Sequence, residues 1–171
     1  VRVLRGSTLE RRRLFAGPGD PVFLGRVHAA RPRRGGGAWL AADAGLFIVD
    51  TQYVLPIAAD VGPLVDVREV PEGPLSGLWL VSPSSLLLVL EEETAQFTIP
   101  DLLGPQAALA VDPGGRRALL LAGPEALVLE PSGLDLDVYG LAFDPGTPRA
   151  AAATRRGLWL ATERGLFRLP V

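Results

Sequence analysis

An all-β fold made of a fourfold repeat is predicted by three observations. One short phrase of mainly apolar residues recurs every 40 residues through the 171-residue chain. Its apolar runs last only five or six residues between Gly, Pro and Asp signals, which favours strands over helices. Both faces of each expected strand are apolar, which is typical of strands buried between neighbouring sheets. The four copies lie at residues 37–47, 77–87, 117–127 and 157–167.

The centre of each copy is expected to be a β-hairpin. In the first copy, the apolar runs 39–42 and 46–49 flank a turn that contains Asp43 and Gly45. Gly and Asp tolerate the positive φ that such a tight turn needs. All three tryptophans of the chain share one position of the repeat, and Leu119 takes that position in the third copy.

Further strands are expected on both sides of each hairpin. The expected first strands are 22–27, 64–67, 107–111 and 139–143, and the expected outer strands are 52–57, 95–99 and 134–138. Four strands in about 40 residues, each sheet sandwiched between its neighbours, predict the blades of a small β-propeller.

The N-terminal segment is expected to close the ring. The fourth repeat stops after its second hairpin strand, so a strand from 1–4 or 13–16 would fill the vacant place and remove an exposed sheet edge. The alternative is an eight-bladed ring of two chains, in which each chain gives its N-terminal strand to the other. The prediction is a single domain, 1–171, with a closing segment at about 1–20 and blades at about 21–60, 61–102, 103–138 and 139–171.

The fourth copy resembles a known family. Residues 157–168 read Gly-Leu-Trp-Leu-Ala-Thr-Glu-Arg-Gly-Leu-Phe-Arg. This is similar to the two-component regulator propeller repeat, whose core is Gly-x-Trp-x-(Ala/Gly)-Thr-x-x-Gly-Leu-(Tyr/Phe). The resemblance implies a β-propeller fold, and in that family the propellers are sensory or ligand-binding parts of large membrane signalling proteins. Since this chain shows neither a membrane-spanning run nor a kinase segment, sensing is not expected of it.

Composition argues against several classes of function. The chain has no cysteine, which excludes a disulfide framework, a zinc-ribbon motif and a thiol nucleophile. No apolar run approaches the roughly 18 to 20 residues of a membrane span, and no signal peptide is visible, so a cytoplasmic protein is expected. Asn, Cys and Met are absent while Pro is abundant, which predicts a thermostable protein with a Tm above about 65 °C.

No catalytic or metal-binding pattern is found in the sequence. His28 is the only histidine and is expected to be a structural residue, because no Gly-x-Ser-x-Gly nucleophile elbow accompanies it. Neither a His pair nor the Asp-rich spacing of a calcium loop occurs. The chain is therefore expected to be no enzyme and to need no cofactor and no metal.

The candidate site is a group of arginines that come just before the hairpins of three repeats. Equivalent loops lie on one face of a propeller, so these side chains should converge and suit carboxylates, phosphates or an acidic protein surface. Acidic residues at 91–93, Glu130 and Asp50 should lie on the same face, so a salt-bridge network that neutralises the arginines is the alternative. The candidates are Arg31, Arg33, Arg34, Arg116, Arg117, Arg155 and Arg156, together with Arg11, Arg12 and Arg13.

The net charge of −2 hides a segregation of charge along the chain. Residues 1–34 carry nine arginines against two acids, residues 35–137 carry three against fifteen, and residues 138–171 carry five against two.

We expect a non-catalytic protein-interaction module, an accessory or scaffold subunit of a larger assembly, that is itself a monomer or homodimer. The alternative is a propeller that binds a small ligand, carbohydrate or anion. Nucleic-acid binding through the arginine-rich face has less support, because the pI is about 5.4.

Overall fold

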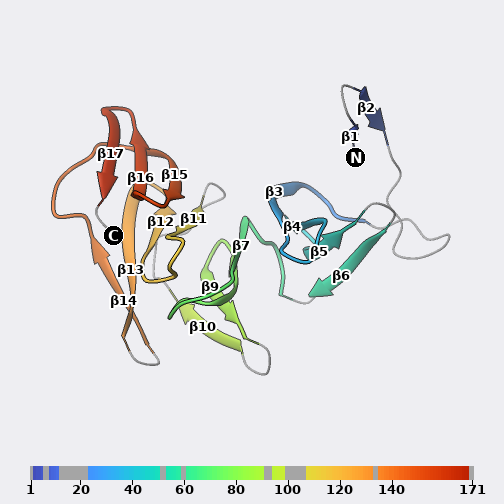
Figure 1. The fold of residues 1–171 in the computed structure, drawn as a ribbon, viewed down its shortest axis with the longest axis horizontal. Helices are drawn as coiled ribbons and strands as arrows, with labels where there is room; N and C mark the ends of the chain where they lie inside the picture. Colours follow the sequence, from blue (N-terminus) through green and yellow to red (C-terminus); the bar gives the residue numbers. More distant parts are fainter. Residues whose placement is uncertain are drawn as a thin grey trace.

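The computed structural model describes residues 2–5, 8–11, 23–50, 53–58, 61–90, 94–98, 107–132 and 135–169. Every regular element in these ranges is a β-strand, which confirms the all-β prediction (Figure 1). None of the described residues belongs to a helix that could cross a membrane.

Four antiparallel sheets follow one another along the chain, one for each repeat. Sheet 1 consists of β3 (Val27–Pro32), β4 (Ala38–Ala42), β5 (Gly45–Val49) and β6 (Val54–Ala58). Sheet 2 consists of β7 (Asp66–Val70), β8 (Gly77–Val81), β9 (Ser85–Val89) and β10 (Thr94–Thr98). Sheet 3 consists of β11 (Ala108–Val111), β12 (Ala118–Ala122), β13 (Glu125–Ser132) and β14 (Asp135–Gly140). Sheet 4 has three strands, β15 (Pro148–Thr154), β16 (Gly157–Thr162) and β17 (Gly165–Leu169).

The central hairpins lie where the turn residues place them. Gly45 has φ 110° and Gly165 has φ 139°, a region that favours glycine. The second repeat has Ser85 in this position, and there the Ser82 hydroxyl accepts a hydrogen bond from the Ser85 N–H at 2.9 Å. A short serine turn thus replaces the glycine turn without changing the hairpin.

Two of the predicted first strands are wrong. In sheet 1, β3 begins at Val27 instead of residue 22, because Gly25 has φ 66° and turns the chain before the strand. In sheet 4, the predicted strand 139–143 begins inside β14, and the first strand is the alanine-rich β15. Alanine has low strand propensity, so pairing with β16 determines this strand rather than its own sequence.

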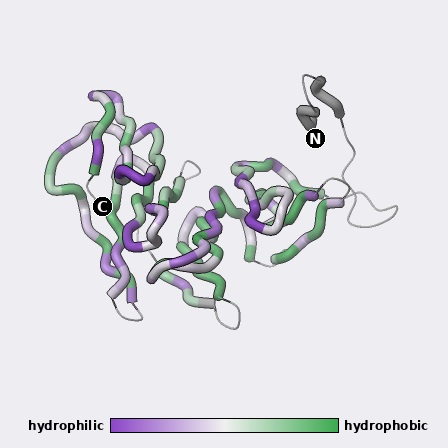
Figure 2. The backbone as a smooth tube through the Cα atoms, in the orientation of Figure 1, coloured by the Kyte–Doolittle hydropathy of each residue, from purple (hydrophilic) through white to green (hydrophobic). Residues whose placement is uncertain are grey.

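Sheets 2 and 3 each pack one face on the sheet before and the other on the sheet after, whereas sheets 1 and 4 each pack on one neighbouring sheet. We call the face on the side of the sheet before the backward face, and the other the forward face. Figure 2 shows hydrophobic residues along strands of all four sheets. The repeat position of the tryptophans belongs to the forward face, and its strand neighbours belong to the backward face. The three interfaces pair Trp39, Ala41 and Leu46 with Leu78 and Leu80, then Trp79, Val81 and Leu86 with Leu120 and Leu127, then Leu119, Leu121 and Ala126 with Leu158 and Leu160.

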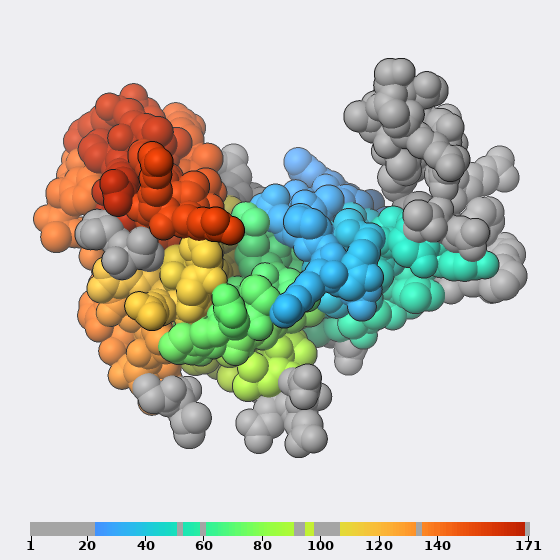
Figure 3. Space-filling model, in the orientation of Figure 1, coloured from blue at the N-terminus to red at the C-terminus, as the bar shows by residue number. Residues whose placement is uncertain are grey.

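The sheets are arranged as an open arc, in chain order, with sheets 1 and 4 at its two ends (Figures 1 and 3). The inner strands contact one another in the order β3, β7, β11 and β15. This arrangement fits a propeller-like fold. The N-terminal strand β1 (Arg2–Arg5) pairs with β2 (Thr8–Arg11) rather than with β17, and 13–16 lies outside the described residues. Ring closure by the N-terminal segment therefore stays a prediction.

Candidate functional site

A buried carboxylate, that of Asp66, joins three neighbouring sheets at their inner strands. Asp66 is 1% exposed. Its Oδ1 accepts a hydrogen bond from Nε of Arg31 in sheet 1 at 2.9 Å and also lies 2.9 Å from Nη2 of that guanidinium. Its Oδ2 accepts the N–H of Leu109 in sheet 3 at 3.0 Å and lies 3.6 Å from Nε of Arg68. One side chain thus binds groups of all three sheets.

Arg68, which lies two residues after Asp66 on the same face of β7, completes this cluster. Its Nε donates to the carbonyl oxygen of Leu109 at 2.5 Å, so Asp66 and Arg68 bind both backbone groups of one residue on the inner edge of β11. Burial lowers the pKa of Arg68, and the charge of Asp66 opposes this effect. In sheets 3 and 4 the same two repeat positions are alanines, which are Ala108 and Ala110, then Ala150 and Ala152.

The predicted arginine site is only partly formed by free side chains. Arg31 belongs to the Asp66 cluster, and Nε of Arg117 forms an ion pair with Glu130 at 2.5 Å. The guanidinium of Arg33 lies over the ring of Trp39, 5.4 Å from its centroid, where a cation–π attraction operates. The ion pairs of Arg31 and Arg117 support the neutralised, structural interpretation for these two arginines, while Arg33 is held by the aromatic ring and keeps its charge unpaired by any described acid.

The remaining loop arginines are exposed and form no ion pair with the residues that the structure describes. They lie in the β3–β4, β11–β12 and β15–β16 loops, which are equivalent connections of sheets 1, 3 and 4. Their convergence on one site stays a prediction, as does the role of Arg11, while Arg12 and Arg13 lie outside the described residues. These free side chains are Arg34, Arg116, Arg155 and Arg156.

A cavity of about 420 Å³ lies beside the first arginine loop, between sheets 1 and 2. Glu69 in its wall accepts a hydrogen bond from Nε1 of Trp39 at 2.8 Å and another from the N–H of Arg34 at 3.0 Å. The carboxylate therefore already has two donors and fixes the loop. The cavity lining is Pro32, Arg33, Arg34, Glu69, Pro71 and Glu72.

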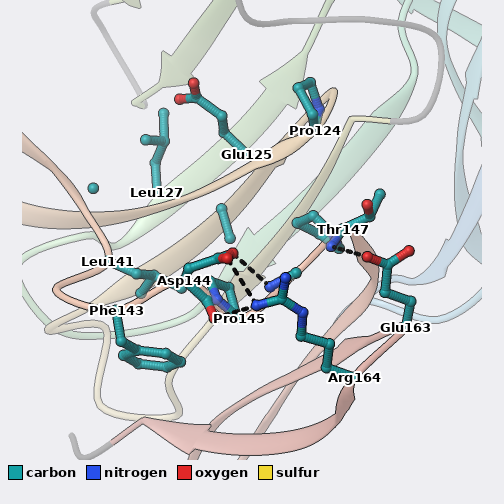
Figure 4. A pocket seen from close by; sticks show the side chains of 14 residues that line it. Pro124, Glu125, Leu127, Leu141, Phe143, Asp144, Pro145, Thr147, Glu163 and Arg164 are labelled. Atoms are coloured by element: carbon teal, nitrogen blue, oxygen red, sulfur yellow. Dashed lines mark hydrogen bonds and ion pairs between the residues drawn. The ribbon is translucent and has the colours of Figure 1, made fainter.

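A second cavity, of about 480 Å³, lies between sheets 3 and 4, where the linker 141–147 crosses (Figure 4). Asp144 holds this linker, because its Oδ2 pairs with Nη1 of Arg164 at 2.7 Å and its Oδ1 accepts the N–H of Gly146 at 2.9 Å. Glu163 accepts the N–H of Thr147 at 3.4 Å. This site was not predicted from the sequence, because residues 141–143 of the linker were expected to belong to a strand.

The pKa of Asp144 is lowered first by the Gly146 N–H and then by Arg164. We expect Arg164→Ala to raise this pKa only part of the way back to the ordinary value of 3.8. Because the pKa of Asp144 is lower in the folded protein than in the unfolded chain, the ionised carboxylate contributes stability that is fully present above pH 3.8. This contribution is lost as the pH falls through the lower pKa of the folded protein. A carboxyl-carbon NMR titration of both proteins measures this, and an unchanged Asp144 pKa in the variant would contradict the assignment.

His28 connects β3 to the turn between β4 and β5. Its Nε2 lies 2.7 Å from Oδ1 of Asp43, and the other oxygen of Asp43 accepts the N–H of Arg26 at 2.7 Å. The pKa of Asp43 is lowered, first by the Arg26 N–H and then by His28. Within the described residues no serine or threonine hydroxyl is hydrogen-bonded to His28, and no three His, Asp or Glu residues are placed to hold a metal ion.

The forward face of sheet 4 differs from the three other forward faces in being exposed. The β17 residue Leu166 is 65% exposed, whereas Leu46 and Leu86 at the same repeat position are 1% and 0% exposed. Trp159 donates its Nε1 hydrogen to Thr154 within its own sheet at 3.0 Å. The equivalent Trp39 donates to Glu69 of the following sheet.

The second hairpin strand of sheet 4 also carries a charge on this face, at a position where the equivalent strands of the other sheets carry none. Arg168 lies at the repeat position where the earlier sheets have apolar residues, which are Ile48, Leu88 and Val128. Its Nε donates to the carbonyl oxygen of Arg156 at 2.8 Å, and the side chain is exposed. A single arginine in an otherwise apolar repeat position was the signal in the sequence that could have identified this surface. We call Trp159, Ala161, Leu166 and Arg168 the end face.

No protein-family model matches the chain, and the search of curated proteins found no similar protein. The similarity to two-component regulator propellers therefore depends on the repeat residues alone.

Proposed function

We propose that the protein is a non-catalytic interaction module with a propeller-like fold, and that its end face on sheet 4 holds a partner protein. The single observation behind this proposal is the 65% exposure of Leu166 at a position that is buried in sheets 1 and 2. An apolar sheet face built like three buried interfaces of the same chain is suited to a protein surface. An accessory subunit of a larger assembly has such a face.

The proposal is tested with Leu166→Arg and a matched control. Leu55 is also an exposed leucine, at 44%, but it lies on β6 of sheet 1, at the opposite end of the arc. The immobilised wild type is expected to retain a co-purifying protein from lysate at moderate salt and with nuclease. Leu166→Arg should lose it and Leu55→Arg should keep it. Equal retention by both variants would contradict the proposal, because the end face would then have no role.

Ring completion is the competing use of the same face. Closure within one chain, or an eight-bladed ring of two chains, would cover the end face with sheet 1. Sedimentation of the purified protein identifies the two-chain ring, and cross-linking between sheets 1 and 4 in a monomer identifies the closed one. Either result in the absence of a partner would replace the interaction proposal.

Anion binding is a second candidate function, favoured by the exposed loop arginines. Guanidinium groups without acidic partners are available to carboxylates or phosphates. Those groups belong to Arg34, Arg116, Arg155 and Arg156. In the capture experiment this function predicts salt-sensitive retention that Leu166→Arg leaves unchanged.

A further inference from the structure

We propose that the protein binds a small anion in a third cavity, at the inner strands of sheets 2, 3 and 4, and that Arg68 holds the carboxylate or phosphate group of this anion. The inference rests on the anion-binding function proposed above, for which it specifies a site, and it is independent of the end face. The space, the charge and the hydrogen-bond donors at this cavity support it.

The cavity has a volume of about 450 Å³ and is lined by three inner strands that lie next to one another. Strand β11 contacts both β7 and β15. The lining comes from residues 68–71, 110–113 and 151–153, so the cavity lies where these strands lead into the loops before β8, β12 and β16. A cavity of this size accommodates a small molecule.

A change from arginine to alanine at one repeat position leaves this space. The position lies opposite the tryptophan position where the inner strand pairs with the first hairpin strand. It is Arg31 in sheet 1 and Arg68 in sheet 2, but Ala110 in sheet 3 and Ala152 in sheet 4. Alanine cannot reach into the cavity as an arginine can, so space for a ligand is left beside Arg68.

The cluster beside the cavity has more positive than negative charge. Arg31 and Arg68 share one carboxylate, that of Asp66, and each of the two arginine side chains is 30% exposed. The same carboxylate also accepts the N–H groups of Val67 and Leu109. Because burial of a charge is costly unless the charge is paired, an anion in the cavity would stabilise the second guanidinium.

Arg68 has the donors that such an anion needs. Its Nε donates to the carbonyl oxygen of Leu109, and no described residue accepts a hydrogen bond from its two terminal nitrogens. A guanidinium binds carboxylates and phosphates through two parallel hydrogen bonds. The bond to Leu109 holds the guanidinium at the cavity wall, so less side-chain entropy is lost when a ligand binds.

The two acids of the cavity lining are bound to other donors. Glu69 accepts hydrogen bonds from Nε1 of Trp39 and from the N–H of Arg34, both in the first repeat. Asp112 accepts three backbone N–H groups of the turn 112–117. Neither acid forms an ion pair with Arg68. These contacts engage both carboxylates and leave Arg68 available to a ligand.

The test uses the full chain and two probes, succinate and inorganic phosphate, titrated at constant ionic strength and followed by NMR. We expect shifts of the Arg68 side-chain Nε–H and of the amides of 110–112, and none with the neutral succinamide. Arg68→Gln should weaken binding of the tighter probe by about tenfold, because a charge-assisted pair of hydrogen bonds is lost. The control Arg149→Gln changes an exposed arginine of β15 outside the lining and should leave the affinity unchanged.

A second variant leaves the Arg68 cluster intact. Ala152→Leu places a larger side chain in the cavity lining at an exposed position, and it should weaken binding by filling the space. The amide spectrum without probe shows whether each variant is folded. The probe that binds more tightly identifies the ligand group as a carboxylate or a phosphate.

Three results would overturn the inference. They are an unchanged affinity of folded Arg68→Gln, equal binding of succinamide, and shifts that lie away from the cavity. If binding persists in Arg68→Gln but is lost when the exposed loop arginines are changed together to glutamine, the anion-binding function stands and belongs to the loops. If the wild type binds neither probe, both the site and the anion-binding function are rejected.

Discussion

Asp66→Ala is expected to lower the free energy of unfolding by about 3 to 5 kcal/mol, the cost of breaking a buried ion pair on one side. The change removes the acceptor of Arg31, the ionic partner of Arg68 and the acceptor of the Leu109 N–H. Two half-buried cations and a backbone donor then lose their partners. Denaturant unfolding of the variant and the wild type measures the difference.

The control is Asp135→Ala, which alters an exposed acid of β14 and should change the stability by less than about 0.5 kcal/mol. The double variant Asp66→Ala with Arg68→Ala copies the alanines of sheet 3 at these positions and should regain part of the loss. If Asp66→Ala costs no more than the control, the cluster does not connect the three sheets in solution.

Trp79→Ala and Trp159→Ala are expected to differ strongly although they change the same repeat position. Trp79 is 2% exposed between sheets 2 and 3, and its loss should cost about 3 to 5 kcal/mol. Trp159 lies on the open end face, so its loss should cost roughly 1 to 2 kcal/mol, including its hydrogen bond to Thr154. Denaturant unfolding measures both costs. Equal costs would mean that the end face is covered in solution, by ring closure or by a second copy.

The parts of the fold that local chemistry determines could be predicted from the sequence. The hairpins could be placed because their turns use glycine or serine between two apolar runs, and the period of 40 made their equivalence visible. The strand β15 could not be placed, because its proline and its run of alanines have little strand propensity of their own. Its position depends on pairing with β16, which is a contact that propensity does not describe.

The candidate site was harder to predict for a similar reason. The expected arginine loops exist, but the ion pair of Arg31 with Asp66 depends on how closely sheets 1 and 2 pack, which the sequence does not state. Asp66 was nevertheless detectable as an acid at a repeat position that is Ala108 in sheet 3 and Ala150 in sheet 4. In this chain, a charged residue at a repeat position that is apolar in other repeats indicated the buried cluster better than a group of like charges did.

The single-file order of the sheets determines how the molecule fluctuates. Among the described strands, the main contacts between sheets join neighbours in the arc, so opening sheet 4 breaks one such interface, whereas opening sheet 2 breaks two. In such a linear array, local unfolding is concentrated at the ends, and the middle keeps most of the cooperativity. Sheet 4 is therefore expected to detach and dock again while sheets 2 and 3 remain folded.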